Sequence, residues 1–400
     1  RSIDDGVAAA ERDIAPAQNL LLATRDEIAM VLAGDLPRRA ARHDSLGRTP
    51  SRGWLPQNRW QGTLGHGANP LFRAPDSGVL GNTNNRTSDR AFPFHVSHDC
   101  GDTQRIQRLE RLMAAREVHT RESFIEAQLD TVSTPARVLL PLVAAELWFQ
   151  QSAAPDGTLD RRRREALDLL AEWNGEMNEH LPQPLIYHTW MRALNRRLIE
   201  DDLGSTLTPA FARPDPLFLE RVFRDVDGAA AWCDVRQSTQ IETCAEMASA
   251  ALDDALIWLD ETYGGRLDTL NWGDAHQATH DHPVLGTTPG LGWLVNIRQS
   301  TSGSDHTLQR GATVGHGPDP FLNTHGAAYR GIYDLADPDT SVFVISTGQS
   351  GHPLSRFYDN LSELWRRGDY VAMSLDPSLA RAASEGTALL VPEGSRGVPS

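Results

Sequence analysis

The stretch from Tyr329 to Tyr370, YRGIYDLADPDTSVFVISTGQSGHPLSRFYDNLSELWRRGDY, is the part of the sequence that decides the fold class. Two apolar runs of strand length, AYRGIYDL and SVFVIST, are joined by the turn-forming ADPDT. A Gly-rich loop follows, and amphipathic spacing predicts a helix from about Leu354 to Arg367. The stretch therefore predicts a strand, a turn, a second strand, a loop and a helix in that order.

A second hairpin is predicted near the start of the chain, from Ala15 to Gly34. The apolar runs QNLLLAT and EIAMVLA are separated by the turn-favouring Arg25-Asp26. Their nearly continuous apolarity predicts burial on both faces. The preceding RSIDDGVAAAERD is typical of the end of a helix.

A loop-rich segment extends from Pro37 to Asp99 and carries the aromatic residues Trp54 and Trp60. It is too long for an ordinary connection, so we expect it to carry function or to pack on another chain.

Helical periodicity begins at Gln104, where Ile106, Leu109, Leu112 and Met113 share one face, and Thr120 can cap the next helix. Further helices are predicted at about 135–150, 160–175, 184–203, 215–225 and 240–263. Strands at both ends with helices between them predict an α+β fold with one discontinuous sheet core. We expect a hairpin and wrapping loops in 1–100, a mainly helical insertion in 101–265, and loops, returning strands and a C-terminal helix in 266–400.

Composition excludes two classes of protein. The 38 basic and 53 acidic residues give a formal net charge of −15, and no lysine is present, so non-specific nucleic-acid binding is disfavoured. No apolar run of about 18 residues occurs, so no membrane span is expected, and the N-terminus lacks the pattern of a signal peptide.

Three cysteines are present. Cys233 and Cys244 lie in WCDVRQSTQIETC, where a disulfide would close a short loop before a helix. In an exported protein the bridge is favoured over two free thiols. Cys100 is then left over, and we expect it to be a buried or inert thiol.

Five blocks carry a resemblance to a known family. They are PAQNLLLATRDEIAMVLAGDLPRR, GNTNNR at 81–86, LNWGDAHQATHDHPVLG at 270–286, HGAAYRGIYDL and TGQSGHPLS. Their order and spacing resemble those of the penicillin acylases, amidases of the N-terminal-nucleophile hydrolase superfamily, over nearly the whole chain. The chain is similar to the C-terminal portion of the β subunit. The resemblance implies part of an αββα sandwich with a large helical insertion.

The resemblance also implies roles for individual residues. Asn19 matches the Asn whose side-chain amide stabilises the oxyanion of the family's reaction. Arg39 matches an Arg near the active site that orders this Asn or a free α-amine, while Asn84, Asn85 and Arg86 line or brace the site. From the residues alone, Asn19 is more typical of a turn or cap, and the alternative for Arg39 is a solvated loop residue.

In the family, a Ser at the start of the β subunit attacks the substrate, and its own α-amine acts as the base through a water. Ser2 is not that residue, because the family nucleophile precedes the matching Asn by about two hundred residues and is followed by an apolar strand. We therefore expect the nucleophile, the acyl pocket and any calcium site on an upstream β-subunit segment. That segment and an α subunit, processed autoproteolytically from the same precursor in the periplasm or outside the cell, would be the partners.

The histidines His276, His280 and His282 suggest a zinc site, because HxxxH and HxH are metal-binding spacings. Against zinc, the blocks WGDAH and HPVLG match family blocks that bind no metal, and HQATHD between them is typical of a loop. We instead expect no metal in this chain, with Trp272, Asp274 and His276 in a structural network. GQSG is no nucleophile elbow because His352 stands where GxSxG needs Gly, so Ser350 is expected to be a turn hydroxyl.

The function implied is hydrolysis of a linear amide of a small molecule through an acyl-enzyme, with this chain inactive by itself. The acyl group could be phenylacetyl, a dicarboxylate, or a fatty acyl chain as in acyl-homoserine lactone acylases. The alternatives are a non-catalytic scaffold or binding protein of the same fold, and a zinc hydrolase.

Overall fold

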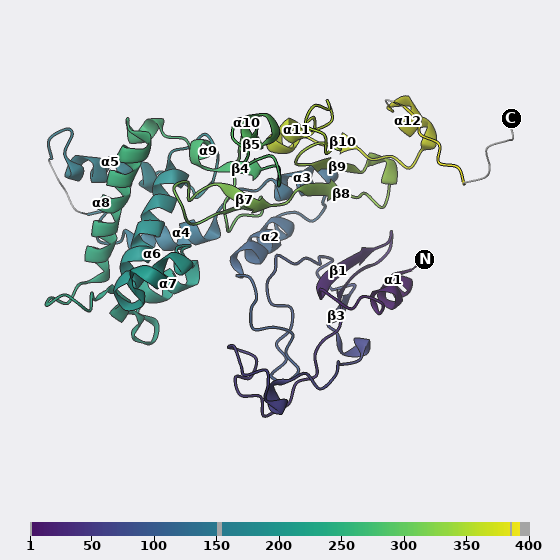
Figure 1. Ribbon diagram of the computed structural model, residues 1–400, viewed down its shortest axis with the longest axis horizontal. Helices are drawn as coiled ribbons and strands as arrows, with labels where there is room; N and C mark the ends of the chain where they lie inside the picture. The colour runs from purple at the N-terminus through teal and green to yellow at the C-terminus, as the bar shows by residue number, and fades with distance from the viewer. Residues whose placement is uncertain (1, 150–153, 385, 393–400) are drawn as a thin grey trace.

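The computed structural model describes residues 2–149, 154–384 and 386–392. Helices gather at one end of an elongated molecule, small sheets of the C-terminal half lie beside them, and the N-terminal hairpin with its loops forms a separate body (Figure 1). Among the described residues, no helix combines the length and apolarity needed to cross a bilayer.

The predicted N-terminal hairpin is confirmed. β1 (Gln18–Ala23) pairs antiparallel with β2 (Ile28–Ala33), which also pairs with the short β3 (Leu71–Arg73). The preceding helix is α1 (Ile3–Ala10), capped by the Ser2 hydroxyl. Besides β3, the helices and strands of the loop-rich segment are two short 3-10 turns, η1 (Pro56–Asn58) and η2 (His66–Ala68).

Burial of the hairpin on both faces is correct for β2 and wrong for β1. All but the first residue of β2 are buried, whereas Leu20 and Leu21 of β1 are 37% and 53% exposed. The reason is topological, because β2 is the central strand of this sheet and β1 is an edge.

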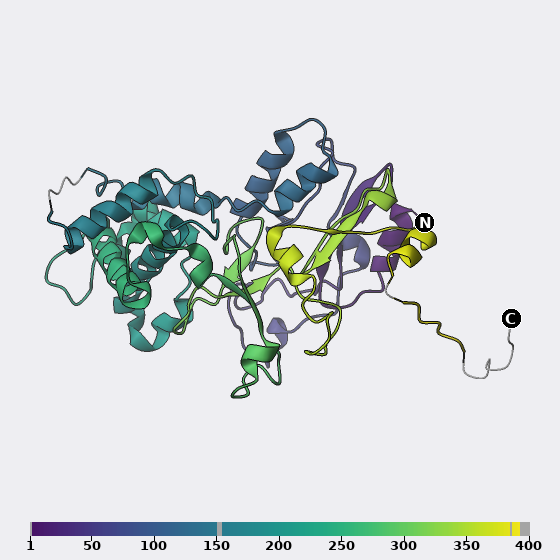
Figure 2. The same cartoon turned by 90° about the horizontal axis from the view of Figure 1, so that it is seen from above.

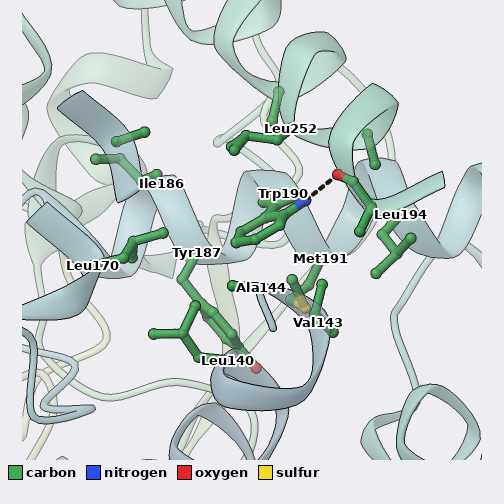
Figure 3. Packing of buried hydrophobic residues seen from close by; sticks show 14 of the residues in the cluster. Leu140, Val143, Ala144, Leu170, Ile186, Tyr187, Trp190, Met191, Leu194 and Leu252 are labelled. Atoms are coloured by element: carbon green, nitrogen blue, oxygen red, sulfur yellow. Dashed lines mark hydrogen bonds between the residues drawn. The ribbon is translucent and has the colours of Figure 1, made fainter. Parts of the chain in front are cut away.

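The helical end holds the large core of the molecule. It is built from α4 (Thr134–Val143), α5 (Leu159–Ala171), α6 (Gln183–Leu207), α7 (Pro216–Phe223) and α8 (Cys244–Tyr263), with the 3-10 segments η3 (Thr208–Phe211), η4 (Val226–Cys233) and η5 (Leu267–Thr269). Trp190 of α6 is fully buried, and its indole N–H donates to the Ala248 carbonyl of α8 over 2.9 Å (Figure 3). Aliphatic side chains close around it from α4, α5, α6 and α8.

The helix predictions in this part are confirmed within a few residues, and their differences have local causes. The helix predicted to end near 150 ends at Val143, two residues after Pro141, which lacks the N–H that a helix interior needs. Residue 150 itself lies outside the described residues. Thr243 caps α8 in a capping box, so this helix begins at Cys244 rather than near 240.

Two helices join the helical end to the rest. α2 (Gln104–Ala114) packs on α4, and α3 (Arg121–Gln128) packs on β8 (Tyr329–Ile332). Seen from above, the two blue helices lie side by side next to the helical end (Figure 2). Thr120 caps α3 as predicted.

The C-terminal half contains two further sheets. One has the order β5-β4-β7-β6, from β4 (Gln277–His280), β5 (Ile297–Ser300), β6 (Gly311–Thr313) and β7 (Asn323–Gly326). The other has the order β10-β9-β8, with β9 (Val342–Ile345) and β10 (Val371–Ala372). The remaining elements are α9 (Trp272–Ala275), α10 (Gly292–Val295), η6 (Pro338–Thr340), α11 (Ser362–Arg367) and α12 (Pro377–Ala382).

These sheets confirm the predicted β8–β9 hairpin and correct three other expectations. HQATHD is not a loop, because Gln277–His280 forms the central strand β4. The strands form three separate sheets within the described residues rather than one discontinuous sheet. The helix predicted from Leu354 begins only at Ser362, because side chains of Ser350, His352 and Ser355 bond nearby backbone N–H groups in turns.

Candidate active site

Asn19 lies on the edge strand β1, opposite Leu32 of β2, and is half-buried. It lines a small cavity of about 270 Å³ together with Ala10, Asp13 and Ala33. In the described part of the chain, the Asn19 side chain makes no hydrogen bond. An amide with two free N–H donors beside a cavity can donate to an oxygen that enters it.

Arg39 follows β2 and is half-buried. Its guanidinium donates to the backbone carbonyl of His95 over 3.1 Å, and burial lowers its pKa. This contact does not reach Asn19, so the ordering of Asn19 by Arg39 stays a prediction.

A basic cluster surrounds His95 and brings two of the predicted residues together. The ring of His95 stacks on that of His98 at 4.2 Å. Burial, reinforced by the positive charges of Arg39, His98 and Arg86, lowers the pKa of His95 to about 4. His95 is therefore neutral at pH 7, and the positive charges that act on it include arginines from two separate loops.

Asn85 braces the loop that carries Arg86. The Asn85 amide oxygen accepts from the backbone N–H of Thr83 over 3.0 Å, and the Arg86 guanidinium donates to the Ser88 carbonyl over 2.8 Å. Asn84 adopts a left-handed conformation, with φ 73°, and lines a second and larger cavity rather than that of Asn19. The three residues thus reach three different surroundings.

The three histidines of the zinc alternative do not converge. The two ring nitrogens of His276 lie 2.8 and 2.9 Å from the carbonyl oxygens of Thr301 and Gly311, which leaves neither free for a metal. His280 packs edge-on against Trp365, and His282 accepts N–H groups in a turn. Within the described residues, no three metal-binding side chains are grouped.

The expected structural network exists around His276 but does not include Asp274. Trp272 is fully buried, donates to the Gly303 carbonyl over 2.9 Å, and stacks on His276 at 4.6 Å. On its other face Trp272 stacks on His188 at 4.8 Å. Asp274 is exposed at the surface of α9, which corrects its assignment to the network.

The serine hydroxyls and the paired cysteines singled out in the sequence have structural roles. Ser2 accepts the N–H of Asp5 as the α1 cap, and Ser350 accepts the N–H of His352 in a turn, as expected. Cys233 and Cys244 form the predicted disulfide, which ties η4 to the start of α8. Cys100 is exposed in the coil before α2, so it is not a buried thiol, and its expected inertness stays a prediction.

The larger cavity was missed by sequence reasoning. It has a volume of about 620 Å³ and lies between α2, α4, α6, α7 and the loops around β6. Arg105, Arg192 and Arg310 line it from three distant parts of the sequence, and His188 lines it from α6. No local pattern joins these residues, because charged residues on helices usually face solvent.

Comparisons with known proteins agree with this architecture. Residues 1–382 match the penicillin amidase family. An acyl-homoserine lactone acylase, QuiP, of Pseudomonas aeruginosa is 26% identical over 387 residues, covering 90% of this chain and 44% of the relative. Penicillin acylase 2 proenzyme of a Pseudomonas species is 25% identical over 84% of this chain and 42% of its own length. The chain thus spans less than half the length of these curated relatives.

A solved structure shows the same fold. The thermostable penicillin G acylase from Alcaligenes faecalis superposes with a TM-score of 0.63 at 16% identity, over 98% of this chain and 70% of the other. The likeness confirms the predicted α+β fold class with a large helical part. By its sequence match and its fold, the chain belongs to the penicillin amidase family.

Proposed function

We propose that this chain is the C-terminal part of an amidohydrolase that cleaves a linear amide through an acyl-enzyme, with Asn19 in the oxyanion hole. The observation that carries the proposal is the unpartnered side-chain amide of Asn19 beside a cavity on an edge strand. The nucleophile is a Ser hydroxyl at the N-terminus of another segment of the same protein.

The reaction has two steps. The Ser oxygen attacks the amide carbonyl, the Ser proton passes through a water to the free α-amine and then to the leaving amine, and the C–N bond breaks. Water then attacks the resulting ester and releases the carboxylic acid and the Ser. In each step negative charge develops on the carbonyl oxygen, where the Asn19 N–H donor stabilises it by about 3 kcal/mol.

The exposed edge of the hairpin is evidence that another segment covers it in the complete protein. Among the described residues, β1 has a neighbouring strand on one side only, and Leu20 and Leu21 are exposed on it. An apolar edge strand left open is an aggregation hazard, which proteins ordinarily cover. The upstream β-subunit segment that carries the Ser would cover it and bring the nucleophile to Asn19.

The remaining parts of the proposal concern the complete protein. An α subunit and the upstream segment arise from one autoproteolytically processed precursor, and any calcium is held by the upstream segment. The Cys233–Cys244 disulfide supports a periplasmic or secreted location, because such bridges persist in oxidising compartments.

The test is Asn19→Ala in the complete protein. We expect kcat to fall by about 100-fold with little loss of folding, because one oxyanion donor is removed. Thr24→Ala is the control, since its hydroxyl accepts from the hairpin turn and its loss loosens the hairpin without removing the amide. Near-normal turnover of Asn19→Ala, or an equal loss in Thr24→Ala, would contradict the role of Asn19.

A second candidate is a more specific form of the first. Relatives named acyl-homoserine lactone acylase favour a fatty acyl amide as the substrate. We expect kcat/KM for a long-chain N-acyl-homoserine lactone to exceed that for penicillin G by more than about tenfold, which corresponds to about 1.4 kcal/mol in the transition state. The reverse ratio would favour a phenylacetyl substrate, and no turnover of either would favour a non-catalytic scaffold.

A further inference from the structure

The larger cavity differs from that of Asn19 in the chemistry of its walls. Arg105 comes from α2, Arg192 from α6, and Arg310 from the residue before β6. Leu139, Met191 and Phe321 line the same cavity, so it presents guanidinium groups and apolar surface together.

Arg105 is almost completely buried. It is 9% exposed, it donates from one terminal nitrogen to the Asn84 amide oxygen over 3.1 Å, and its Nε has no partner in the described part of the chain. Burial, reinforced by the positive charge of Arg310, lowers its pKa. A buried guanidinium beside a second one is costly unless an anion joins them.

Arg192 and Arg310 are also short of acceptors. The Nε of Arg192 is buried without a partner, and its guanidinium forms no hydrogen bond or ion pair with the described residues. Among the described residues, Arg310 makes one hydrogen bond, from its Nε–H to the backbone carbonyl oxygen of Asp305 over 3.3 Å. Neither arginine has a carboxylate partner there.

The carboxylates around the cavity accept their hydrogen bonds from other groups, although the negative charge of Asp102 partly offsets the lowering of the Arg105 pKa. Asp102 lies 2.7 Å from the His306 ring nitrogen, and Asp305 accepts from the Thr313 hydroxyl over 2.9 Å. Asp215 accepts the N–H of Leu217 at the start of α7 over 2.8 Å. The acidic side chains therefore leave donor capacity of the arginines unused.

We propose that this cavity binds a small organic carboxylate with an apolar body, its carboxylate held by Arg105 and Arg310. Arg192 supplies a further donor from the α6 wall. Arginine is suited to this role because its planar fork matches a carboxylate with two parallel hydrogen bonds. Leu139, Met191 and Phe321 receive the apolar body, as in ligand pockets generally.

Binding is tested with phenylacetate and 2-phenylacetamide, which share a shape and differ in charge. Titration calorimetry uses the protein with all of its chains. We expect phenylacetate to bind at least tenfold more tightly than the amide, and Arg310→Gln to weaken phenylacetate binding at least tenfold. Arg161→Gln removes an equal charge from an exposed ion pair with Glu165 on α5 and should change nothing. Asn19→Ala should also bind phenylacetate normally, which separates this cavity from the candidate active site.

A second measurement uses the wild-type protein, so its result does not depend on whether a variant folds. Phenylglyoxal modifies accessible arginines, and mass spectrometry maps the sites. Phenylacetate should protect Arg192 and Arg310 and leave Arg161 reactive. Equal affinity for the amide, unchanged binding in Arg310→Gln, or absence of protection would overturn the proposal. If Arg192 and Arg310 do not react with phenylglyoxal even without phenylacetate, and the protein does not bind phenylacetate, then a carboxylate of another segment fills the cavity. This outcome also overturns the proposal.

Discussion

The helical end and the N-terminal hairpin bury their apolar residues in opposite ways. The largest fully buried side chains, among them Trp190, Leu139 and Leu185, belong to one continuous core in the helical end. The hairpin buries a small cluster of Ala10, Val31 and Ala33. One region closes its core with its own residues, whereas the other leaves half of its strand pair open.

The physical difference lies in where the hydrogen bonds go. A helix satisfies its backbone internally, so α6 and α8 need only an apolar face to pack together. An edge strand such as β1 keeps a row of unpaired backbone groups, and its outward side chains need a partner. Mutations in the helical end should therefore change the free energy of unfolding. Mutations in the hairpin should instead change the assembly of this chain with its partner segments.

The largest effect is expected for Trp190→Ala. It empties the centre of the helical core and removes the hydrogen bond to Ala248, which should cost about 3–5 kcal/mol of unfolding free energy. Trp293→Ala, at an exposed site on α10, should cost less than about 0.5 kcal/mol. Urea denaturation followed by circular dichroism measures both. Similar losses in the two variants would mean that the helical end has no continuous core.

Acid should destabilise the helical end through His188. Burial lowers its pKa to about 4, whereas in the unfolded chain it is near 6.5. Between these values the unfolded state binds a proton that the folded state does not, so stability falls as the pH drops from 6.5 towards 4. The loss is roughly 3 kcal/mol at most. Melting temperatures between pH 7 and 4 should fall less steeply in His188→Gln than in the wild type.

The hairpin side has a counterpart in His95, whose pKa is lowered first by burial, as that of His188 is, and further by neighbouring arginines. Its pKa of about 4 comes from burial together with the charges of Arg39, His98 and Arg86. Salt screens charges more than it changes burial, so added salt should reduce the His95 contribution to acid unfolding and leave that of His188 largely unchanged. Equal salt sensitivity in His95→Gln and His188→Gln would remove this distinction.

Sequence reasoning succeeded where the signal is local. The cap at Thr120 follows from spacing within one element, and the structure has it. The β1–β2 hairpin likewise follows from two runs and a turn. Exposure of β1 could not be predicted, because it depends on which strands lie beside it.

The features that sequence reasoning did not predict also depend on contacts between distant parts of the chain or on irregular local structure. β4 has only four residues, of which Ala278 alone is buried, so its pattern resembles a loop. The late start of α11 follows from turns in which the side chains of Ser350, His352 and Ser355 accept backbone N–H groups, and the helical spacing of the apolar residues there does not reveal these turns. The arginines of the larger cavity are brought together only by packing of α2, α6 and the β6 region. Asn19 was identified by its match to a family, and its chemical role stays a prediction.

The disulfide offers a smaller test within the helical end. Replacing Cys233 and Cys244 by Ser should cost about 2–3 kcal/mol, because the bridge closes a short loop. The loss should be local, so hydrogen exchange should rise in η4 and the first turn of α8 and stay unchanged around Trp190. Cys100→Ser is the control at an exposed thiol. Uniform exchange changes throughout the core would show that the bridge supports the whole helical end.

The smallest effect on stability, and the most informative for the comparison, is expected for Leu21→Ser. Leu21 is 53% exposed, so unfolding of this chain alone should change by less than about 0.5 kcal/mol. If an upstream segment covers β1, the same change should weaken assembly of the complete protein, because a buried leucine is then lost at the contact. Ile257→Ser, at a similarly exposed site on α8, should leave assembly intact. Size-exclusion chromatography with mass detection separates the two results, and intact assembly in Leu21→Ser would mean that the open edge of β1 is simply a solvated surface.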